Sequence, residues 1–298
     1  MSRIERALEK AAQMRAAVTA SGGSHDLPAR PAPRRTFEPA VFKPGEGSVD
    51  RAKVDRHIVG ITDPYSFAAE EYRKLRARVL RSTKKDFHNT IMVTSAQSGE
   101  GKTITAINLA VALAQELDHT VLLIDTDLRK PPIHTYLGLE PKYGLSDYLT
   151  SRMDLVDIMI KTGIGKLVFV PAGRPPENPA ELINSERMRS LVREVKERYR
   201  DRYVIFDSVP LLAAADSLSL CNYVDGVIFV AAAGRTDQKT AVKALSLIKD
   251  HNILGSVFNN VKKHPEQGRY PYYFRSGAAS GIKSGDGDDG GAHDTVPG

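Results

Sequence analysis

Cysteine is almost missing from this sequence of 298 residues, which contains one, Cys221. A single cysteine excludes a disulfide framework, and it also excludes a metal site built from several thiolates of one chain. This usage is typical of a protein that works in a reducing compartment.

Long apolar segments are missing as well. One of the longest uninterrupted runs is Val227–Ala233, far short of the ~20 apolar residues that a membrane-spanning helix requires. Charged residues at positions 3, 5, 6 and 9 leave no room for the apolar core of a signal peptide. We therefore expect a cytoplasmic protein that does not cross a membrane by itself.

A strong excess of either charge is the third missing feature. Lysine and arginine number 42 against 36 aspartates and glutamates, which gives a formal charge of +6. This weak excess permits an acidic partner, such as nucleotide, nucleic acid or a membrane surface, but indicates none of them. The 41% of hydrophobic and 26% of charged residues are ordinary for a globular protein, which excludes a wholly disordered chain, a coiled coil and a collagen-like repeat.

Four segments differ in composition and pattern. Residues 1–19 carry apolar side chains at helical spacing and predict an amphipathic helix. In residues 20–62 the periodicity disappears and proline and glycine accumulate, which predicts a disordered linker. The pair Asp63–Pro64 is a helix-start signal and opens the main domain, residues 63–265. The Gly-, Ser- and Asp-rich tail, residues 266–298, is expected to be disordered as well.

Within the main domain, short apolar segments alternate with helical patterns. The segments are β-branched and almost continuously apolar, as strands covered on both faces must be. The predicted strands are Thr90–Ser95, Thr120–Asp125, Lys166–Pro171, Tyr203–Asp207, Gly226–Ala232 and Gly255–Phe258, and the main helices between them are Lys102–Leu117, Ser185–Tyr199 and Gln238–Lys249. Such alternation implies right-handed crossovers. The sequence therefore predicts an α/β fold, a mostly parallel sheet with helices on both faces.

A glycine-rich loop lies between the first of these strands and the helix that follows. Residues 96–103 read Ala-Gln-Ser-Gly-Glu-Gly-Lys-Thr and match the phosphate-loop pattern, with Ala96 in place of the first glycine. In such a loop, backbone N–H groups and the helix N-terminus surround the phosphates, the lysine contacts the β and γ oxygens, and the threonine holds Mg²⁺. The alternative is a chance glycine-rich turn, which the strand–loop–helix context disfavours. The predicted nucleotide-binding residues of this segment are Ser98, Gly99, Glu100, Gly101, Lys102, Thr103 and Ile104.

Three aspartates stand at the ends of predicted strands. Asp125 ends the second strand, Asp127 lies two residues after it, and Asp207 ends the fourth. Because the carboxyl ends of parallel strands face the ligand crevice, all three carboxylates can converge on the phosphate loop. An aspartate at a strand end is also a common turn initiator, but the presence of a phosphate loop favours the functional interpretation.

Together these motifs resemble those of the bacterial tyrosine kinases of capsule and exopolysaccharide synthesis. The match comprises the phosphate loop, the Asp-x-Asp-x-Arg motif at Asp125–Arg129 and Asp207, and it extends over about residues 60–265. The resemblance implies a P-loop NTPase fold of the MinD/ParA-like branch that uses ATP and Mg²⁺. It implies a positioning and charge-neutralising chemistry in which an aspartate, Asp125, accepts the tyrosine proton. The implied catalytic residues are Lys102, Asp125 and Asp127, and the implied metal-binding residues are Thr103, Asp125 and, through water, Asp207.

Two further segments match this family. Glu70, Arg73 and Arg76 recur every third residue and lie near one helix face. In the family such an element docks on a neighbouring subunit and supports a ring, whereas the residues alone are typical of a solvated face with intrahelical ion pairs. Asn259 aligns with an asparagine that reads the adenine edge in the family, although an asparagine at a strand end is usually turn chemistry.

The C-terminal segment contains three tyrosines, Tyr270, Tyr272 and Tyr273, in a proline-broken and polar-flanked context that is unlike a core. The family's autophosphorylated tyrosine cluster would account for them; the alternative is an aromatic anchor that packs back on the domain. Residues 1–12 resemble the start of stand-alone kinases encoded with exopolysaccharide/exosortase systems. Those kinases act with a separate membrane-embedded chain-length determinant, which implies a location at the inner face of the membrane through this partner.

The resemblance thus predicts an ATP-dependent protein-tyrosine autokinase that phosphorylates its C-terminal tyrosines in trans and regulates exopolysaccharide polymerisation or export. The main alternative is a ParA/MinD-like positioning ATPase, which shares the fold and the aspartates. Those ATPases usually carry a second lysine where this chain has Gln97, and they give no role to the tyrosines. A catalytically dead nucleotide-binding scaffold conflicts with the complete set of site residues. A nucleic-acid-binding regulator lacks any recognisable signature, so we expect no nucleic-acid partner.

Overall fold

The computed structural model describes residues 49–85, 87–151, 153–198 and 201–262. These residues all belong to one compact unit of the chain. The predicted N-terminal helix (residues 1–19), most of the predicted linker and the three tail tyrosines lie outside the described residues.

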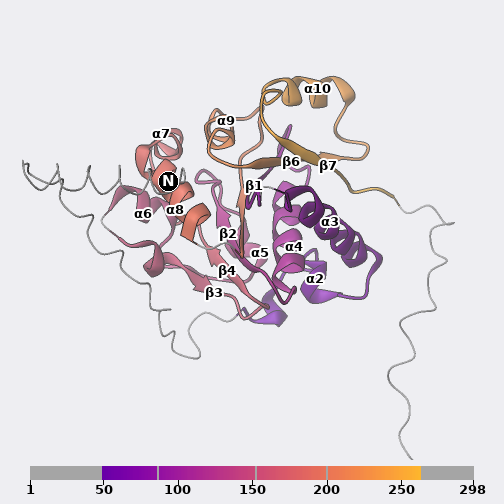
Figure 1. The fold of residues 1–298 in the computed structure, drawn as a ribbon, viewed down its shortest axis with the longest axis horizontal. Coiled ribbons are helices and arrows are strands. Elements are labelled where there is room, and N and C mark those ends of the chain that lie inside the picture. The colour runs from indigo at the N-terminus through magenta and orange to yellow at the C-terminus, as the bar shows by residue number, and fades with distance from the viewer. Residues whose placement is uncertain (1–48, 86, 152, 199–200, 263–298) are drawn as a thin grey trace, which may run out of the picture. The chain divides into compact units, whose positions relative to one another are not determined.

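A seven-stranded sheet forms the centre of the described domain (Figure 1). Its strands are β1 (Thr90–Ser95), β2 (Thr120–Asp125), β3 (Ile160–Lys161), β4 (Leu167–Val170), β5 (Arg202–Asp207), β6 (Gly226–Ala232) and β7 (Ile253–Asn259), in the order β3-β4-β2-β5-β1-β6-β7. All pairs are parallel except β3 with β4. The predicted parallel sheet is confirmed, and the six predicted strands are present with ends that differ by at most two residues.

The helices include the long ones that the sequence predicts and several short ones that it does not. The α-helices are α2 (Val59–Thr62), α3 (Phe67–Thr83), α4 (Lys102–Ala114), α5 (Ile133–Tyr136), α6 (Leu145–Thr150), α7 (Pro179–Ile183), α8 (Glu186–Arg198), α9 (Asp216–Cys221) and α10 (Gln238–Ser246), and two 3₁₀ turns are η1 (Arg51–Lys53) and η2 (Leu155–Ile158). The helices α2, α5, α6, α7 and α9 are too short to show a helical period, so tertiary packing, not sequence pattern, identifies them.

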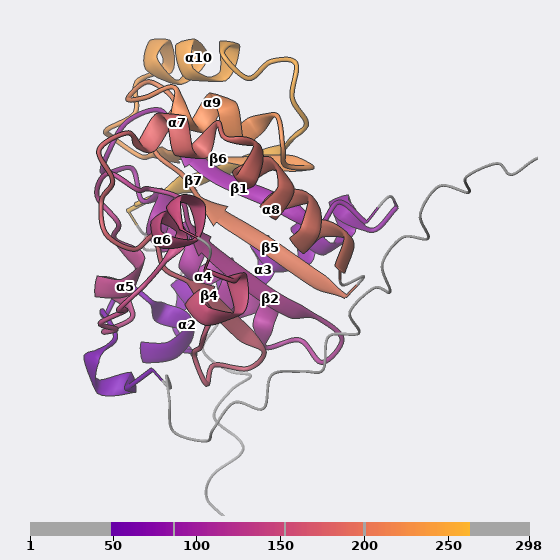
Figure 2. The same cartoon turned by 90° about the vertical axis from the view of Figure 1, so that its left-hand side faces the viewer.

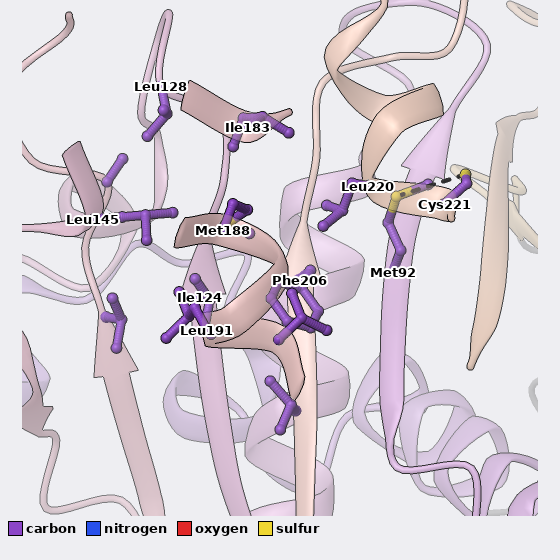
Figure 3. Close-up of a cluster of buried hydrophobic side chains, with 14 of the residues drawn as sticks. Met92, Ile124, Leu128, Leu145, Ile183, Met188, Leu191, Phe206, Leu220 and Cys221 are labelled. Carbon is purple, nitrogen blue, oxygen red and sulfur yellow. Dashed lines mark hydrogen bonds between the residues drawn. The ribbon is translucent and has the colours of Figure 1, made fainter. Parts of the chain in front are cut away.

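Helices cover both faces of the sheet (Figures 1 and 2). On one face, α4 is buried along almost its whole length and packs with Val79 of α3 against β1, β2 and β5. On the other face, shown in close-up in Figure 3, Met188 and Leu191 of α8 pack on Ile124 and Phe206 of the sheet. Because both faces are buried, the strands are apolar at successive positions, and the carboxyl edge of the sheet is left for polar side chains.

The single cysteine belongs to this second face. Cys221 Sγ lies 3.9 Å from Met92 Sδ, and burial raises the pKa of its thiol to about 12 (Figure 3). A thiol with such a pKa stays protonated at neutral pH, so Cys221 packs as a small apolar side chain rather than acting as a nucleophile.

The prediction that the linker extends to residue 62 is wrong, because residues 49–62 pack on the domain. Ile58 is fully buried, and Val49 N–H donates to the Thr162 carbonyl at 2.8 Å. Asn108 of α4 fixes the segment: its Oδ1 accepts from Gly60 N–H at 3.1 Å and its Nδ2 donates to the His57 carbonyl at 2.9 Å. This segment has an irregular backbone, and the side chain that holds it is 48 residues away in the sequence. Its own residues therefore show no local pattern from which its order could be predicted.

The start of α3 also differs from the prediction. The N-cap is Ser66, whose Oγ accepts from Ala69 N–H at 3.1 Å, instead of Asp63. The Asp63–Pro64 pair begins a turn that precedes the helix: Ser66 N–H donates to the Asp63 carbonyl at 3.1 Å. The two signals are three residues apart, and the serine forms the cap. None of the helices in the described part of the chain is both long enough and apolar enough to span a membrane.

Candidate active site

The phosphate loop connects β1 to α4 and is shaped by two glycines. Gly99 and Gly101 have φ of 80° and 94°, in the left-handed region where a side chain is strained. Gly101 is also the N-cap of α4, so the loop leads directly to the N-terminus of a 13-residue helix. That terminus carries partial positive charge and free N–H groups, which favour a phosphate. The loop therefore has the conformation of an anion-binding site, and the alanine at its entrance, Ala96, is buried.

Lys102 and Thr103, the first residues of α4, direct their side chains at carboxylates. Lys102 Nζ lies 3.4 Å from both carboxylate oxygens of Asp207 and 3.5 Å from Oδ2 of Asp127. Thr103 Oγ1 donates a 2.7 Å hydrogen bond to Asp207 Oδ2. The lysine, the threonine and these two aspartates are all buried, so their interactions are little screened by solvent.

Asp125 and Asp207 lie opposite each other on neighbouring strands. β2 and β5 pair in parallel with Asp125 in register with Asp207, so both carboxylates leave the sheet at the same level. Asp125 is fully buried, and its two oxygens accept from Asp127 N–H at 3.1 Å and from Ile133 N–H at 3.2 Å. The structure thus brings together the five residues that the sequence predicts for catalysis and metal binding: Lys102, Thr103, Asp125, Asp127 and Asp207.

This concentration of charge shifts the pKa values of the site. Burial, together with the neighbouring Asp207, raises the pKa of Asp125 well above its ordinary value, against the lowering effect of the Ile133 N–H. Burial also raises the pKa of Asp207, although Lys102 and Thr103 oppose this. For Lys102, burial by itself lowers the pKa, but the three aspartates outweigh it and the net pKa is raised. The lysine therefore stays charged, and burial disfavours the ionised form of both Asp125 and Asp207.

The raised pKa values of Asp125 and Asp207 predict a pH-dependent stability of the protein without nucleotide or divalent ions. Because the native chain holds these protons more tightly than an unfolded chain does, the free energy of unfolding falls as the pH rises from about 4 through the raised pKa values. We expect the melting temperature in EDTA to be about 2–4 °C higher near pH 5.5 than near pH 7.5, the effect of ~1 kcal/mol in a domain of this size. Thermal melts across this pH range measure it.

Asp125→Asn removes one of the two titrating groups and should flatten this dependence. Asp250→Asn, at an exposed aspartate far along the chain from the site, is the control and should leave the slope unchanged. A slope in Asp125→Asn equal to that of the wild type would show that Asp125 does not retain its proton in the native state.

Arg129 of the Asp-x-Asp-x-Arg motif pairs with an acid that sequence analysis missed, Asp216. Arg129 Nε and Nη2 donate to the two carboxylate oxygens of Asp216 at 3.1 and 3.3 Å. These bonds raise the pKa of Arg129. Asp216 is buried and is the first residue of α9, so the pair ties the loop after β2 to α9. An aspartate in the first turn of a helix is ordinary, and nothing in the sequence distinguished it.

Asn259 contacts the phosphate loop in the structure. Its Nδ2 donates to the Glu100 carbonyl at 3.0 Å, so its role as an adenine-reading residue stays a prediction. The Glu100 carboxylate is buried and accepts from Gln97 N–H at 2.7 Å and from Thr236 Oγ1 at 2.5 Å. Glu100 therefore closes the loop on itself and links it to the segment after β6, which sequence analysis did not connect with the site.

Glu70, Arg73 and Arg76 lie on α3 and make contacts within the chain. Arg73 Nε is 2.7 Å from Glu70 Oε2, and Arg73 Nη1 donates to the Pro64 carbonyl at 2.9 Å. Arg76 reaches the neighbouring helix, with hydrogen bonds to the Ala112 carbonyl at 3.2 Å and to Glu116 at 2.9 Å. The intrahelical pairing that the sequence allowed is present, and the subunit-docking role of these residues stays a prediction.

The donor set fits Mg²⁺ and the phosphates of ATP. Mg²⁺ prefers oxygen ligands and is usually held by one or two carboxylates, waters and substrate phosphates, without a cage of protein ligands. The described residues contain no group of three or more His, Cys, Asp or Glu side chains arranged to hold a metal by themselves. Thr103 Oγ1 and Asp207 already share a hydrogen bond at the end of the loop, which is the hydroxyl–carboxylate pair that such a site requires.

Comparison with known proteins agrees with this geometry. Residues 91–270 match the CobQ/CobB/MinD/ParA nucleotide binding domain. Tyrosine-protein kinase YwqD of Bacillus subtilis (strain 168) is 37% identical over 223 residues, which are 74% of this chain and 93% of YwqD. Tyrosine-protein kinase wzc of Salmonella typhi is 30% identical over 225 residues, 74% of this chain but 31% of that protein's length.

Among solved structures, the kinase domain of Escherichia coli tyrosine kinase ETK superposes with a TM-score of 0.64 at 29% identity, covering 70% of this chain and 82% of that one. The predicted fold class and the predicted family are therefore both confirmed. Because it combines the phosphate loop and the three site aspartates with 37% identity to YwqD over 93% of that protein, the chain belongs to the bacterial tyrosine-protein kinases, which are built on the CobQ/CobB/MinD/ParA nucleotide binding domain.

Proposed function

We propose that the chain is an ATP-dependent autokinase that transfers a phosphoryl group to Tyr270, Tyr272 and Tyr273 of a neighbouring copy. The observation that carries the proposal is the buried cluster at the carboxyl edge of the sheet. There Lys102 and Thr103 meet Asp207 at hydrogen-bond distance, and Asp125 stands in register with Asp207. One cation, one hydroxyl and three carboxylates beside a phosphate loop suit phosphoryl transfer, which proceeds by positioning and charge neutralisation.

Each residue of the cluster has a distinct task in the proposed reaction. Lys102 places its positive charge on the β and γ oxygens of ATP, and the loop N–H groups hold the same phosphates. Thr103 and Asp207 hold Mg²⁺, which when bound neutralises the charge that develops on the transferred group. Asp127, whose Oδ2 lies 3.5 Å from Lys102 Nζ, keeps the lysine oriented.

Asp125 is the proposed base. The tyrosine hydroxyl loses its proton to the Asp125 carboxylate as its oxygen bonds to the γ-phosphorus, and ADP leaves with the electrons of the broken P–O bond. A base is more effective when its pKa lies closer to the working pH, and burial raises the pKa of Asp125 in that direction. The N–H groups of Asp127 and Ile133 hold its two oxygens and fix the direction of the carboxylate.

The path of the chain is compatible with tyrosines that reach an active site. β7 ends at Asn259, beside the phosphate loop, and Tyr270 follows 11 positions later. Eleven residues span at most about 40 Å when extended. β7 and β2 are four strand positions apart, which is about 19 Å at the usual spacing. Reach therefore permits transfer within one chain as well as between chains, and an experiment must separate the two.

We assign the transfer to a homo-oligomer, such as a ring, in which Glu70, Arg73 and Arg76 dock one subunit on the next. The further proposed partner is a membrane-embedded chain-length determinant that activates the kinase, and the proposed process is exopolysaccharide polymerisation or export. This places the protein in the cytoplasm at the inner face of the membrane. Resemblance of the first twelve residues and of the α3 motif to such kinases supports these assignments.

Transfer between chains is tested by mixing two complementary variants with Mg·ATP. One is Lys102→Met, which retains the tyrosines; the other carries Phe at positions 270, 272 and 273 and retains the site. We expect phosphotyrosine on the Lys102→Met chain at a rate that rises with protein concentration, because each transfer then requires an encounter. Mass spectrometry of the two chains, distinguished by a tag, measures it. No label on the Lys102→Met chain while the wild type labels itself would mean that each chain phosphorylates only itself.

The helix α3 offers a matched pair of variants for the docking role. Glu70 and Glu71 each pair with a cation three residues on at 2.7 Å, and their side chains are 45% and 48% exposed. Glu70→Ala should lower the concentration-dependent rate and the amount of oligomer seen by analytical ultracentrifugation, whereas Glu71→Ala should change neither. Equal effects of the two substitutions would remove Glu70 from the docking surface.

A further inference from the structure

The phosphate loop is held from outside by two side chains, one from the loop after β6 and one from the end of β7. Arg235, in the loop after β6, donates from Nη2 to the Ser98 carbonyl and from Nη1 to the Gly99 carbonyl, both at 3.2 Å. Asn259, at the end of β7, donates to the next carbonyl, that of Glu100, at 3.0 Å. Three consecutive carbonyls of the loop therefore accept hydrogen bonds from the outside of the loop.

The direction of a carbonyl fixes the direction of the N–H group in the same peptide unit. A trans peptide is planar, and its C=O and N–H point to opposite sides. When the carbonyls of residues 98, 99 and 100 point toward Arg235 and Asn259, the N–H groups of Gly99, Glu100 and Gly101 point the other way. Successive N–H groups that converge in this manner form the concave anion site of a phosphate loop.

The two glycines are matched to this arrangement. A Cβ on Gly99 would lie 2.7 Å from the Nη atoms of Arg235, and a Cβ on Gly101 would lie 1.9 Å from Nδ2 of Asn259. The glycines are thus required for the close approach of the two side chains as well as for their positive φ angles. A side chain at either position would push the Arg235 or Asn259 contact away from the loop.

The backbone that presents Arg235 is itself fixed. Arg235 N–H and Thr236 N–H both donate to the Ala232 carbonyl, at 3.1 and 2.9 Å. Thr236 Oγ1 accepts from Ala232 N–H at 2.8 Å and donates to the buried Glu100 carboxylate. Ala233 N–H donates to the Asn259 carbonyl at 2.8 Å, which ties the turn to β7. The Arg235 side chain is exposed, but these bonds fix the position of its backbone beside the phosphate loop.

We propose that Arg235 is a positioning residue that, with Asn259, pre-organises the phosphate loop for nucleotide. It acts through the loop backbone: it holds the peptide units so that their N–H groups face the phosphates before nucleotide arrives. Without it, part of the binding free energy is spent on ordering a loop with two glycines, whose backbone freedom is large. The inference rests on nucleotide binding by the domain and is independent of which tyrosines receive the phosphate.

Arg235→Ala and Arg235→Lys test this. Two hydrogen bonds worth about 0.5–1 kcal/mol each correspond to a loss of about 5- to 30-fold, because ~1.4 kcal/mol is tenfold. We expect Arg235→Ala to weaken Mg·ADP binding in calorimetry and to raise KM for ATP by about this factor, with kcat within about threefold of the wild type. Arg235→Lys, which can make one of the two bonds, should lie between. The wild-type affinity, measured in the same titration, separates a failure of this inference from an absence of nucleotide binding.

Two further measurements separate positioning from other roles. Lys239→Ala removes the same charge from the exposed surface of α10, four residues along, and should leave Mg·ADP affinity within about twofold. Amide hydrogen exchange of residues 97–103 without nucleotide should be faster in Arg235→Ala than in wild type. If affinity falls but this exchange is unchanged, Arg235 contacts the ligand directly and the proposal is overturned. It is equally overturned if Arg235→Ala binds as well as Lys239→Ala.

Discussion

Asp125→Asn should lower the rate of tyrosine phosphorylation by about 10²–10⁴-fold, the usual effect of removing a general base. The amide is nearly the same size as the carboxylate, so packing is preserved, but an amide cannot take the tyrosine proton. Because Thr103 bonds to Asp207 and not to Asp125, binding of Mg·ADP should weaken far less than the rate falls. Steady-state autophosphorylation measures the rate, and calorimetric titration measures the affinity for Mg·ADP.

Asp207→Asn is the matched control, since both aspartates are fully buried and stand in register on β2 and β5. It should weaken Mg²⁺-dependent nucleotide binding strongly, which reverses the pattern expected for Asp125→Asn. The pH profile adds a second distinction. The wild-type rate should rise with pH as Asp125, with its raised pKa, loses its proton, and this rise should be absent in Asp125→Asn. Retention of more than about a tenth of the activity in Asp125→Asn would exclude Asp125 as the base.

The elements of the fold that can be predicted from the sequence are those with a long apolar run or a recognisable motif. β1, β2 and β5 are buried on both faces and are therefore apolar at successive positions, a pattern that the amino-acid sequence displays directly. The glycines of the phosphate loop are visible for a related reason, because their left-handed conformation and the close approach of neighbours leave few alternatives. In the site, Asp125 and Asp207 could be predicted to meet because parallel strands end at the same edge.

What could not be predicted depends on contacts between distant residues. β3 has two residues, too few for any period, and residues 49–62 are held by Asn108 and Thr162 from far along the chain. Asp216 and Arg235 are unremarkable in the sequence, an acid in a first helical turn and a cation after a glycine. Only their partners, Arg129 and the loop carbonyls, give them a role, and the sequence does not say which residues will be neighbours.

Lys102→Met should reduce phosphoryl transfer by about 10²–10³-fold, comparable to the loss of one electrostatic donor to a developing charge. The methionine fills the space of the lysine stem but brings no charge to the γ-phosphate. The same change removes the cation that lies 3.4 Å from Asp207 and 3.5 Å from Asp127 and that also lowers the pKa of Asp125. Because breaking a buried ion pair leaves an uncompensated charge, unfolding at pH 7.5 in EDTA should become easier by about 3 kcal/mol.

The pH and Mg²⁺ dependence of stability distinguishes two reasons why Lys102→Met could lose activity: a general folding defect, or the loss of the positive charge of the lysine. In Lys102→Met the uncompensated aspartates should take up protons as the pH falls toward 5, so the loss of stability relative to the wild type should become smaller. At pH 7.5, Mg²⁺ should restore part of the lost stability, because it brings positive charge to the same carboxylates. Lys249→Met, at an exposed lysine beyond α10, should match the wild type in both melting temperature and activity. A melting temperature of Lys102→Met equal to the wild type in EDTA at pH 7.5 would show that the aspartates do not depend on this lysine for their charge balance. Activity above about a tenth of the wild type would show that the lysine does not meet the transferred phosphate.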